Sequence, residues 1–199
     1  MPLRGRKPKP KDEMRDKLIE LSRDIFTKYG YQQTNINDIA IAAGMGKSTL
    51  YYYFSGKEAI FKSVIESELQ ELRNSIIEEV KKAIEPQSKI KAYILTRISF
   101  LSLHKNLYTA IREQSLSSFS YAESIRQMFD VMEVQQLTAI LNDGVKDGYF
   151  KINEPEFAAT GLIAALRGVQ LKLLTAPKKA GFEQTLDSLL GILLYGLIK

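Results

Sequence analysis

Apolar side chains recur every three or four residues along most of this chain, and this spacing places them on one face of an α-helix. The first such stripe consists of Met14, Leu18, Leu21, Ile25 and Tyr29. It predicts a helix over residues 12–29. Gly30 follows directly, in the position where a left-handed residue often ends a helix.

The same pattern predicts further helices over about 35–43, 47–54, 57–85, 89–103, 107–117, 121–147, 154–175 and 182–198. No stretch alternates with the period of two that strands require, and no internal repeat is present. We therefore expect an all-α fold. An arm over residues 1–11 would precede a three-helix head over 12–61, and a long helix would join that head to a helical bundle within 62–199.

The most informative segment runs from Thr34 to Lys57, where two short helices are joined by a turn at Gly44. With 3.6 residues per turn, Leu50 and Phe54 share one face of the second helix and point to the core. The opposite face carries Ser48, Thr49 and Tyr52, flanked by Tyr51 and Tyr53, with Lys47 at the N-terminal end. In a helix-turn-helix, residues placed in this way meet base edges in the major groove.

Two other interpretations of this segment need consideration. An aromatic cluster packed in the core would explain Phe54, but three consecutive tyrosines cannot all share one helix face. The run Gly46-Lys47-Ser48 imitates the end of a phosphate-binding loop, but that motif requires glycine where this chain has Ile41, after a strand. We therefore reject a nucleotide triphosphatase.

The charge of the chain agrees with a DNA-binding head. Residues 1–62 contain 12 lysines and arginines against 7 acids, whereas residues 63–199 are balanced at 16 to 16. All of the excess positive charge thus lies beside the two-helix segment, as expected of a nucleic-acid footprint.

The first eleven residues are basic and rich in proline, so they cannot bury enough apolar surface to fold alone. Arg4 and Arg6 could enter a minor groove, where narrow A·T tracts concentrate negative potential. The run Arg4-Gly5-Arg6-Lys7-Pro8 resembles an AT-hook with an inserted lysine. A solubilising tail explains the same residues equally well.

The run Ala43-Gly44-Met45-Gly46-Lys47-Ser48-Thr49-Leu50-Tyr51-Tyr52-Tyr53-Phe54, followed by Lys57-Glu58, resembles the DNA-binding signature of the TetR family of bacterial transcriptional regulators. Upstream, Phe26, Gly30, Tyr31, Thr34, Ile39 and Ala40 also match. The resemblance implies that Lys47, Ser48, Thr49 and Tyr51 to Tyr53 face DNA, while Thr34 and Lys57 hold phosphates. Gly46 departs from the serine common there, but glycine is also tolerated as an N-cap.

TetR-like proteins bind a small molecule in their C-terminal bundle, so the resemblance implies an apolar ligand pocket there. The candidate pocket residues are Tyr93, Arg97, Phe100, His104, Tyr108, Arg112, Phe129, Met132 and Arg167. The alternative is an ordinary bundle core, with the arginines reaching the surface along their aliphatic stems. Arg167 interrupts the most apolar stretch of the chain.

The last two predicted helices are unusually apolar, and the resemblance implies that they pair with those of a second copy in a four-helix bundle. The candidate interface residues are Leu166, Leu173, Leu186, Leu189, Leu190, Leu193 and Leu197. Arg167, Gln170 and Lys172 interrupt the longest apolar stretch, so a membrane span is not expected.

Catalysis has little support, because the chain contains one histidine and no cysteine and shows no recognisable carboxylate pair or metal-ligand spacing. We expect no cofactor, no metal and a cytoplasmic location. The leading hypothesis is a homodimeric, TetR-like repressor that binds a double-stranded DNA operator and is released by a small apolar ligand. The alternatives are an all-α small-molecule binding protein or enzyme with an incidental basic head, and a non-specific architectural DNA-binding protein.

Overall fold

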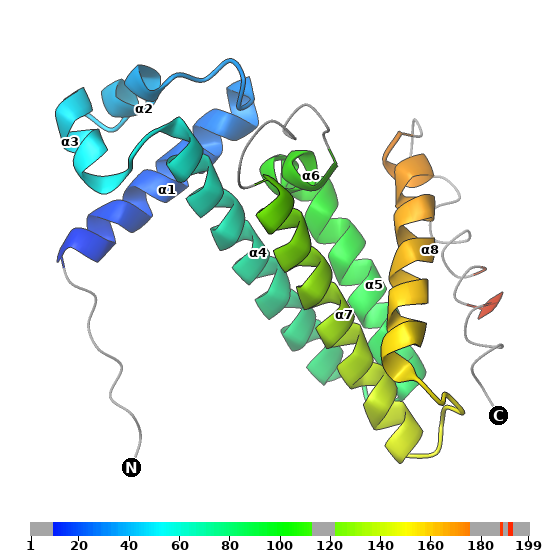
Figure 1. Ribbon diagram of the computed structural model, residues 1–199. Coiled ribbons are helices and arrows are strands. Elements are labelled where there is room, and N and C mark those ends of the chain that lie inside the picture. Colours follow the sequence, from blue (N-terminus) through cyan, green and yellow to red (C-terminus); the bar gives the residue numbers. More distant parts are fainter. Residues whose placement is uncertain (1–9, 113–121, 176–187, 189–190, 193–199) are drawn as a thin grey trace, which may run out of the picture. The chain divides into compact units, whose positions relative to one another are not determined.

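The computed structural model describes residues 10–112, 122–175, 188 and 191–192. Its helices are α1 (Pro10–Tyr29), α2 (Ile36–Ala42), α3 (Lys47–Tyr53), α4 (Lys57–Lys82), α5 (Pro86–Leu103), α6 (Lys105–Arg112), α7 (Ala122–Lys146) and α8 (Pro155–Thr175) (Figure 1). No strand occurs in these ranges, so the all-α prediction is confirmed. The helix predicted over 182–198 lies outside the described residues.

The described residues form two compact units. The first contains residues 10–69 with 104–112 and 122–125, and the second contains residues 70–103 with 126–175, 188 and 191–192. Helix α4 contributes its N-terminal half to the first unit and its C-terminal half to the second. The predicted domain limits at residues 11, 61 and 199 stay a prediction.

The first unit begins with α1, which ends where the sequence predicts. Gly30 has a φ of 80° and its amide donates to the carbonyl oxygen of Phe26, so it is a left-handed cap. Phe26 packs edge-on to Phe61 at 5.1 Å between ring centroids, and Tyr31 lies 4.8 Å from the same ring. This aromatic group joins α1 to α4 and forms the centre of the head.

A buried polar group attaches α6 to the same unit. The Glu68 side chain is 1% exposed, and its carboxylate accepts hydrogen bonds from Leu107 N at 2.8 Å and from Asn106 Nδ2 at 3.1 Å. Asn106 Nδ2 also lies within bonding distance of Thr27 Oγ1 and the Arg23 carbonyl oxygen on α1. Because the first amides of a helix lack partners within the helix, the carboxylate stabilises the start of α6.

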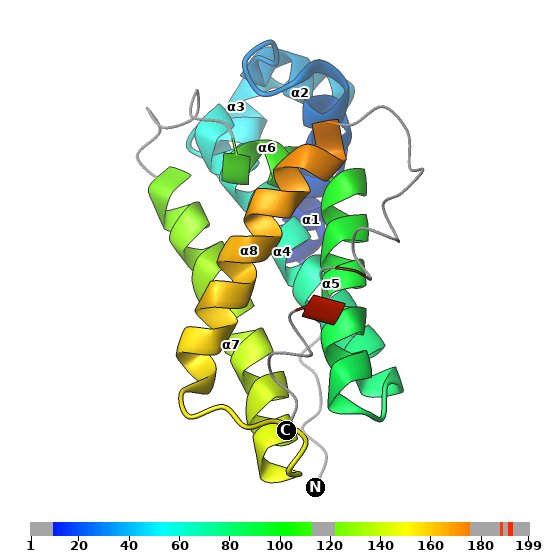
Figure 2. The same ribbon diagram turned by 90° about the vertical axis from the view of Figure 1, so that its right-hand side faces the viewer.

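In the second unit an ion cluster, buried at Arg97 and Glu133, connects α5, α7 and α8. Figure 2 shows the courses of these three helices. Arg97 on α5 donates to Glu133 on α7, and both side chains are almost completely buried. Arg167 on α8 reaches the second oxygen of Glu133 at 3.0 Å and also pairs with Asp130. The apolar core of this unit includes Tyr93, Ile94, Ile98, Phe129, Leu137, Leu141, Leu162 and Ile163.

Candidate nucleic-acid interface

Helices α2 and α3 and the turn between them form a helix-turn-helix in the first unit (Figure 1). Asn35 begins α2: its side-chain oxygen accepts from the amides of Asn37 and Asp38, and Asp38 accepts in return from the Asn35 amide. Gly44, with a φ of 65°, makes the turn, because an L side chain is disfavoured in that conformation. Gly46 is the N-cap of α3 and contributes no side-chain hydrogen bond.

The buried face of this motif is the predicted one. Ile39 and Leu50 are completely buried, and Phe54 is 4% exposed. The guanidinium of Arg15 lies over the Phe54 ring at 5.0 Å from its centroid, so α1 also holds the end of α3. Burial of these side chains fixes which face of α3 points outward.

The outward face of α3 carries the polar residues that the sequence selected. Lys47, Ser48 and Thr49 are exposed. Tyr52 is 65% exposed and Tyr51 is 47% exposed, while Tyr53 is half-buried and its ring lies edge-on to that of Tyr52 at 5.1 Å. Lys47 Nζ lies 6.0 Å from the Tyr51 ring centroid. One short helix therefore presents a cation, two hydroxyls and aromatic rings to solvent.

Thr34 and Lys57 are placed differently from these residues. Thr34 is 2% exposed, and its hydroxyl donates to the carbonyl oxygen of Gly30 at 2.8 Å. Lys57 Nζ donates to the carbonyl oxygens of Thr34 and Tyr31. Burial lowers the pKa of Lys57. Their predicted phosphate contacts stay predictions. Thr34 lies in the loop before α2, and the Lys57 side chain reaches that loop from the start of α4. Arg4 and Arg6 lie outside the described residues.

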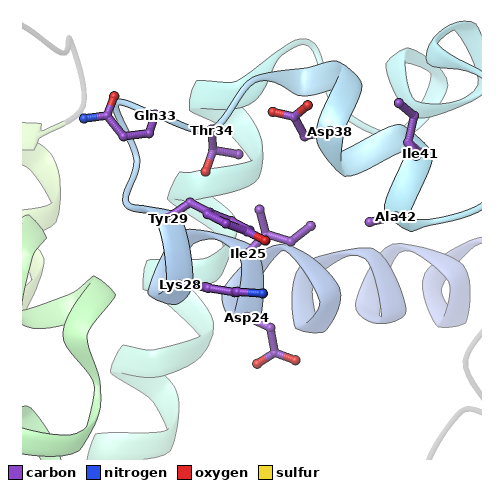
Figure 3. Close-up of a pocket in the computed structure, with 9 residues that line it drawn as sticks. All are labelled: Asp24, Ile25, Lys28, Tyr29, Gln33, Thr34, Asp38, Ile41 and Ala42. Atoms are coloured by element: carbon purple, nitrogen blue, oxygen red, sulfur yellow. The ribbon is translucent and has the colours of Figure 1, made fainter.

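A groove of about 560 Å³ lies between the end of α1 and α2. Figure 3 shows Ile25 and Tyr29 of α1 pointing toward α2, where Ile41 and Ala42 complete the apolar part of the wall. The charged side chains of its lining are Asp24, Asp38 and Lys28. Two acids against one base do not attract phosphate, so this groove is no extension of the α3 surface.

The predicted ligand-pocket residues divide between the two units. Tyr93, Arg97, Phe100, Phe129, Met132 and Arg167 belong to the second unit, whereas His104, Tyr108 and Arg112 belong to the first. Tyr93, Arg97, Phe100 and Phe129 are buried, Met132, His104 and Tyr108 are half-buried, and the Arg167 side chain is 41% exposed. The Arg112 side chain lies outside the part of the chain that the structure describes.

The sequence missed the acids that pair with these arginines. Glu133 accepts from both Arg97 and Arg167, and Arg97 lies over the Phe129 ring at 5.6 Å from its centroid. Burial raises the pKa of Tyr93, and the nearby Glu133 carboxylate adds to that effect. The available signal was an acid on the apolar face of a helix, one turn after Phe129, in a chain whose other apolar helices contain arginines.

Of the predicted interface residues, only Leu166 has a described side chain, and it is 1% exposed within its own unit. Leu173 belongs to α8, but its side chain is not described. The remaining five, Leu186, Leu189, Leu190, Leu193 and Leu197, lie outside the described residues.

In the described part of the chain, no helix has the length and apolar character needed to cross a membrane. No group of three or more histidine, cysteine, aspartate or glutamate side chains within it is arranged to hold a metal ion.

Comparison with known proteins agrees with the geometry of α2 and α3. Residues 18–64 match the bacterial regulatory proteins of the tetR family. The uncharacterised HTH-type transcriptional regulator YhgD of Bacillus subtilis is 24% identical over 142 residues, which are 71% of this chain and 74% of that protein. The HTH-type transcriptional repressor KstR2 of Rhodococcus jostii is 23% identical over 146 residues, covering 71% and 70% of the two chains.

A solved structure shares the fold. The transcriptional regulator FadR of Bacillus subtilis in complex with stearoyl-CoA superimposes with a TM-score of 0.72 at 20% identity, over 91% of this chain and 98% of that one. The likeness therefore extends over both units, although the match to the family lies within the first.

Proposed function

We propose that this chain, which belongs to the TetR family of bacterial regulatory proteins, acts as a homodimeric repressor that a small apolar ligand releases from its operator. The observation that carries the proposal is the outward face of α3. Lys47, Ser48 and Thr49 are exposed at its N-terminal end, while Leu50 on the opposite face is completely buried. This is the presentation that a recognition helix needs in the major groove.

Each exposed residue of α3 has a role that its chemistry supports. Lys47 donates to guanine acceptors, and Thr49 contacts a thymine methyl group or hydrogen-bonds a base edge. Ser48 and Tyr51 to Tyr53 bind phosphate oxygens and position the helix without reading sequence. In the same proposal, Arg4 and Arg6 of the arm enter the minor groove, and Thr34 and Lys57 stand near the phosphates.

Homodimerisation belongs to the proposal because a pseudo-palindromic operator requires two recognition helices about 34–36 Å apart. The pairing surface comprises α8 and the C-terminal stretch, with six of the seven predicted leucines, because Leu166 is buried within its own chain. The head over residues 12–61 reads DNA, and residues 62–199 bind the ligand and the second copy.

The relatives support the ligand and the direction of regulation. KstR2 is a repressor by name, and the FadR structure contains stearoyl-CoA, a molecule with a long apolar chain. By analogy, ligand binding shifts this protein toward a state that fits the operator less well. We propose no catalytic activity for the chain, and a cytoplasmic location where it reaches DNA.

Fluorescence anisotropy with labelled DNA from upstream of its own gene tests the proposal. Tight binding that weakens steeply with salt is expected, because Lys and Arg displace counterions from phosphates. Replacing Lys47 and Thr49 together by alanine should abolish the preference for the operator. The matched control replaces exposed Lys151 and Thr160 by alanine, outside the first unit, and should change nothing.

Two results would support the alternative functions instead. Equal affinity for operator and random DNA indicates a non-specific architectural protein. If the protein shows no salt-dependent DNA binding, it is a helical small-molecule binding protein with an incidental basic head.

A further inference from the structure

We propose that a groove between α4, α5 and α7 in the second unit binds an elongated apolar molecule that ends in a single carboxylate. The groove encloses about 420 Å³, which lies in the range of about 300–1,000 Å³ typical of small-molecule sites. None of the nine pocket residues selected from the sequence lines it. The inference rests on the proposed function for the regulatory role of the ligand, but binding itself can be tested without DNA.

The walls of the groove are apolar over most of their length. Helix α4 contributes Ile76, Ile77 and Val80, and α7 contributes Ala139 and Ile140. Ile77 is 36% exposed and Ala139 is exposed, so apolar surface lies open to water here. An alkyl chain that covers this surface removes it from water, which favours binding in proportion to the area buried.

Three side chains of the lining are charged. Lys81 lies in the last turn of α4 and Lys89 in the first turn of α5, on either side of the short link at 83–85. Asp143 on α7 is the acid of the lining. Neither lysine forms an ion pair within the described part of the chain, and the lining carries one net positive charge.

This charge selects the head group of the occupant. A single carboxylate leaves the lining neutral and forms charge-assisted hydrogen bonds with lysine. A cationic head would meet two lysines, and a neutral head would leave the net charge unpaired. The chemistry of the groove therefore fits an alkyl carboxylate.

The position of the groove on α4 suggests how such a ligand acts. Ile76 and Val80 belong to the same continuous helix whose first half carries Ile60 and Val64, both completely buried in the first unit. A ligand that contacts the second half of α4 thus acts directly on a helix that contributes to the core of the DNA-reading unit.

Isothermal titration calorimetry on the full-length protein without DNA tests the proposal, with decanoate, decanol and decyltrimethylammonium as probes below their aggregation limits. We expect one decanoate per chain, bound at least about tenfold more tightly than either other probe. Lys81→Gln with Lys89→Gln should weaken decanoate binding about tenfold without weakening decanol binding. Lys151→Gln is the charge control and should leave both unchanged.

A steric variant locates the site. Ala139→Phe places a ring in the groove from an exposed position and should abolish decanoate binding, while Gln135→Phe, one turn earlier on α7 and outside the lining, should not. Equal affinity for the three probes, or binding that survives Ala139→Phe, would overturn the proposal. If decanoate does not bind as expected but operator binding is intact, the groove proposal fails and the regulator function stands. If decanoate binds but the operator does not, the regulator function fails and the groove proposal stands.

Discussion

The side-chain ammonium of Lys57 donates a hydrogen bond of 2.7 Å to the backbone carbonyl oxygen of Thr34. It donates a second, of 2.9 Å, to the carbonyl oxygen of Tyr31, and it lies 4.2 Å from the Tyr31 ring centroid. The first residue of α4 thus holds the loop between α1 and α2 closed. This loop sets the direction in which α2, and with it α3, leaves α1.

Lys57→Met should destabilise the protein and leave the electrostatics of DNA binding unchanged. Two carbonyl oxygens lose a charged donor, so we expect a loss of about 1.5–3 kcal/mol in the free energy of unfolding. Urea denaturation followed by circular dichroism measures it. The slope of log affinity against log salt concentration should stay that of the parent protein.

Lys47→Ala provides the contrast, since an exposed lysine that meets DNA contributes to counterion release. Its salt slope should fall by about 1 for each copy, and so by about 2 for the proposed homodimer, with little change in stability. If Lys57→Met lowers the slope by the same amount, Lys57 binds a phosphate, as the sequence predicts.

Glu68 should make stability depend on pH. Burial raises the pKa of this carboxyl, against the opposing effect of its hydrogen bonds from Asn106 and Leu107. The folded protein then binds the proton more tightly than the unfolded chain, so stability falls as pH rises from the ordinary carboxyl pKa through the raised one. Glu68→Gln removes this dependence.

The measurement is the unfolding free energy of the parent minus that of Glu68→Gln, from about pH 4 to pH 8. The difference should decrease across the window and then become constant. The control is Glu78→Gln, an exposed position of the same helix. A difference that increases with pH would show that the hydrogen bonds outweigh burial.

The pair formed by Arg97 and Glu133 should behave as a buried ion pair in a double-mutant cycle. Arg97→Met leaves Glu133 in an ion pair with the partly exposed Arg167 and should cost about 3 kcal/mol. Adding Glu133→Leu should recover part of that loss, because the uncompensated charge disappears. Chemical denaturation of the parent protein, the two single variants and the double variant measures the coupling energy. Purely additive losses in the free energy of unfolding would contradict a buried ion pair.

Gly144→Ala should destabilise the second unit by overpacking. A Cβ at this position of α7 would lie 2.3 Å from the Phe150 ring and 3.1 Å from Pro86 Cβ. We expect a loss of about 1–3 kcal/mol, measured as a lower thermal midpoint. Gly161→Ala, a helical position with nothing within 4 Å, is the control and should be neutral or stabilising. Equal effects of the two would contradict the packing argument.

Helix α3 illustrates how much could be predicted from the sequence. Gly44, Leu50 and Phe54 are placed by local rules of turns and helical periodicity, and the structure confirms all three positions. The start of α6 shows the limit: it was expected at residue 107, but α6 begins at Lys105. The Glu68 carboxylate that accepts from its Leu107 amide comes from α4, 39 residues earlier in the chain, so no local pattern shows it.

By itself, the sequence determined the all-α architecture, the helix-turn-helix and the outward row of Lys47, Ser48 and Thr49, because helical faces depend on neighbours three and four residues apart. Only the tertiary structure decided the partners of the buried charges. Arg97 and Glu133 are separated by 36 residues, and Asn106 reaches the Arg23 carbonyl across 83. Such contacts form because packing brings together helices distant in the chain, where each buried polar group must find a partner.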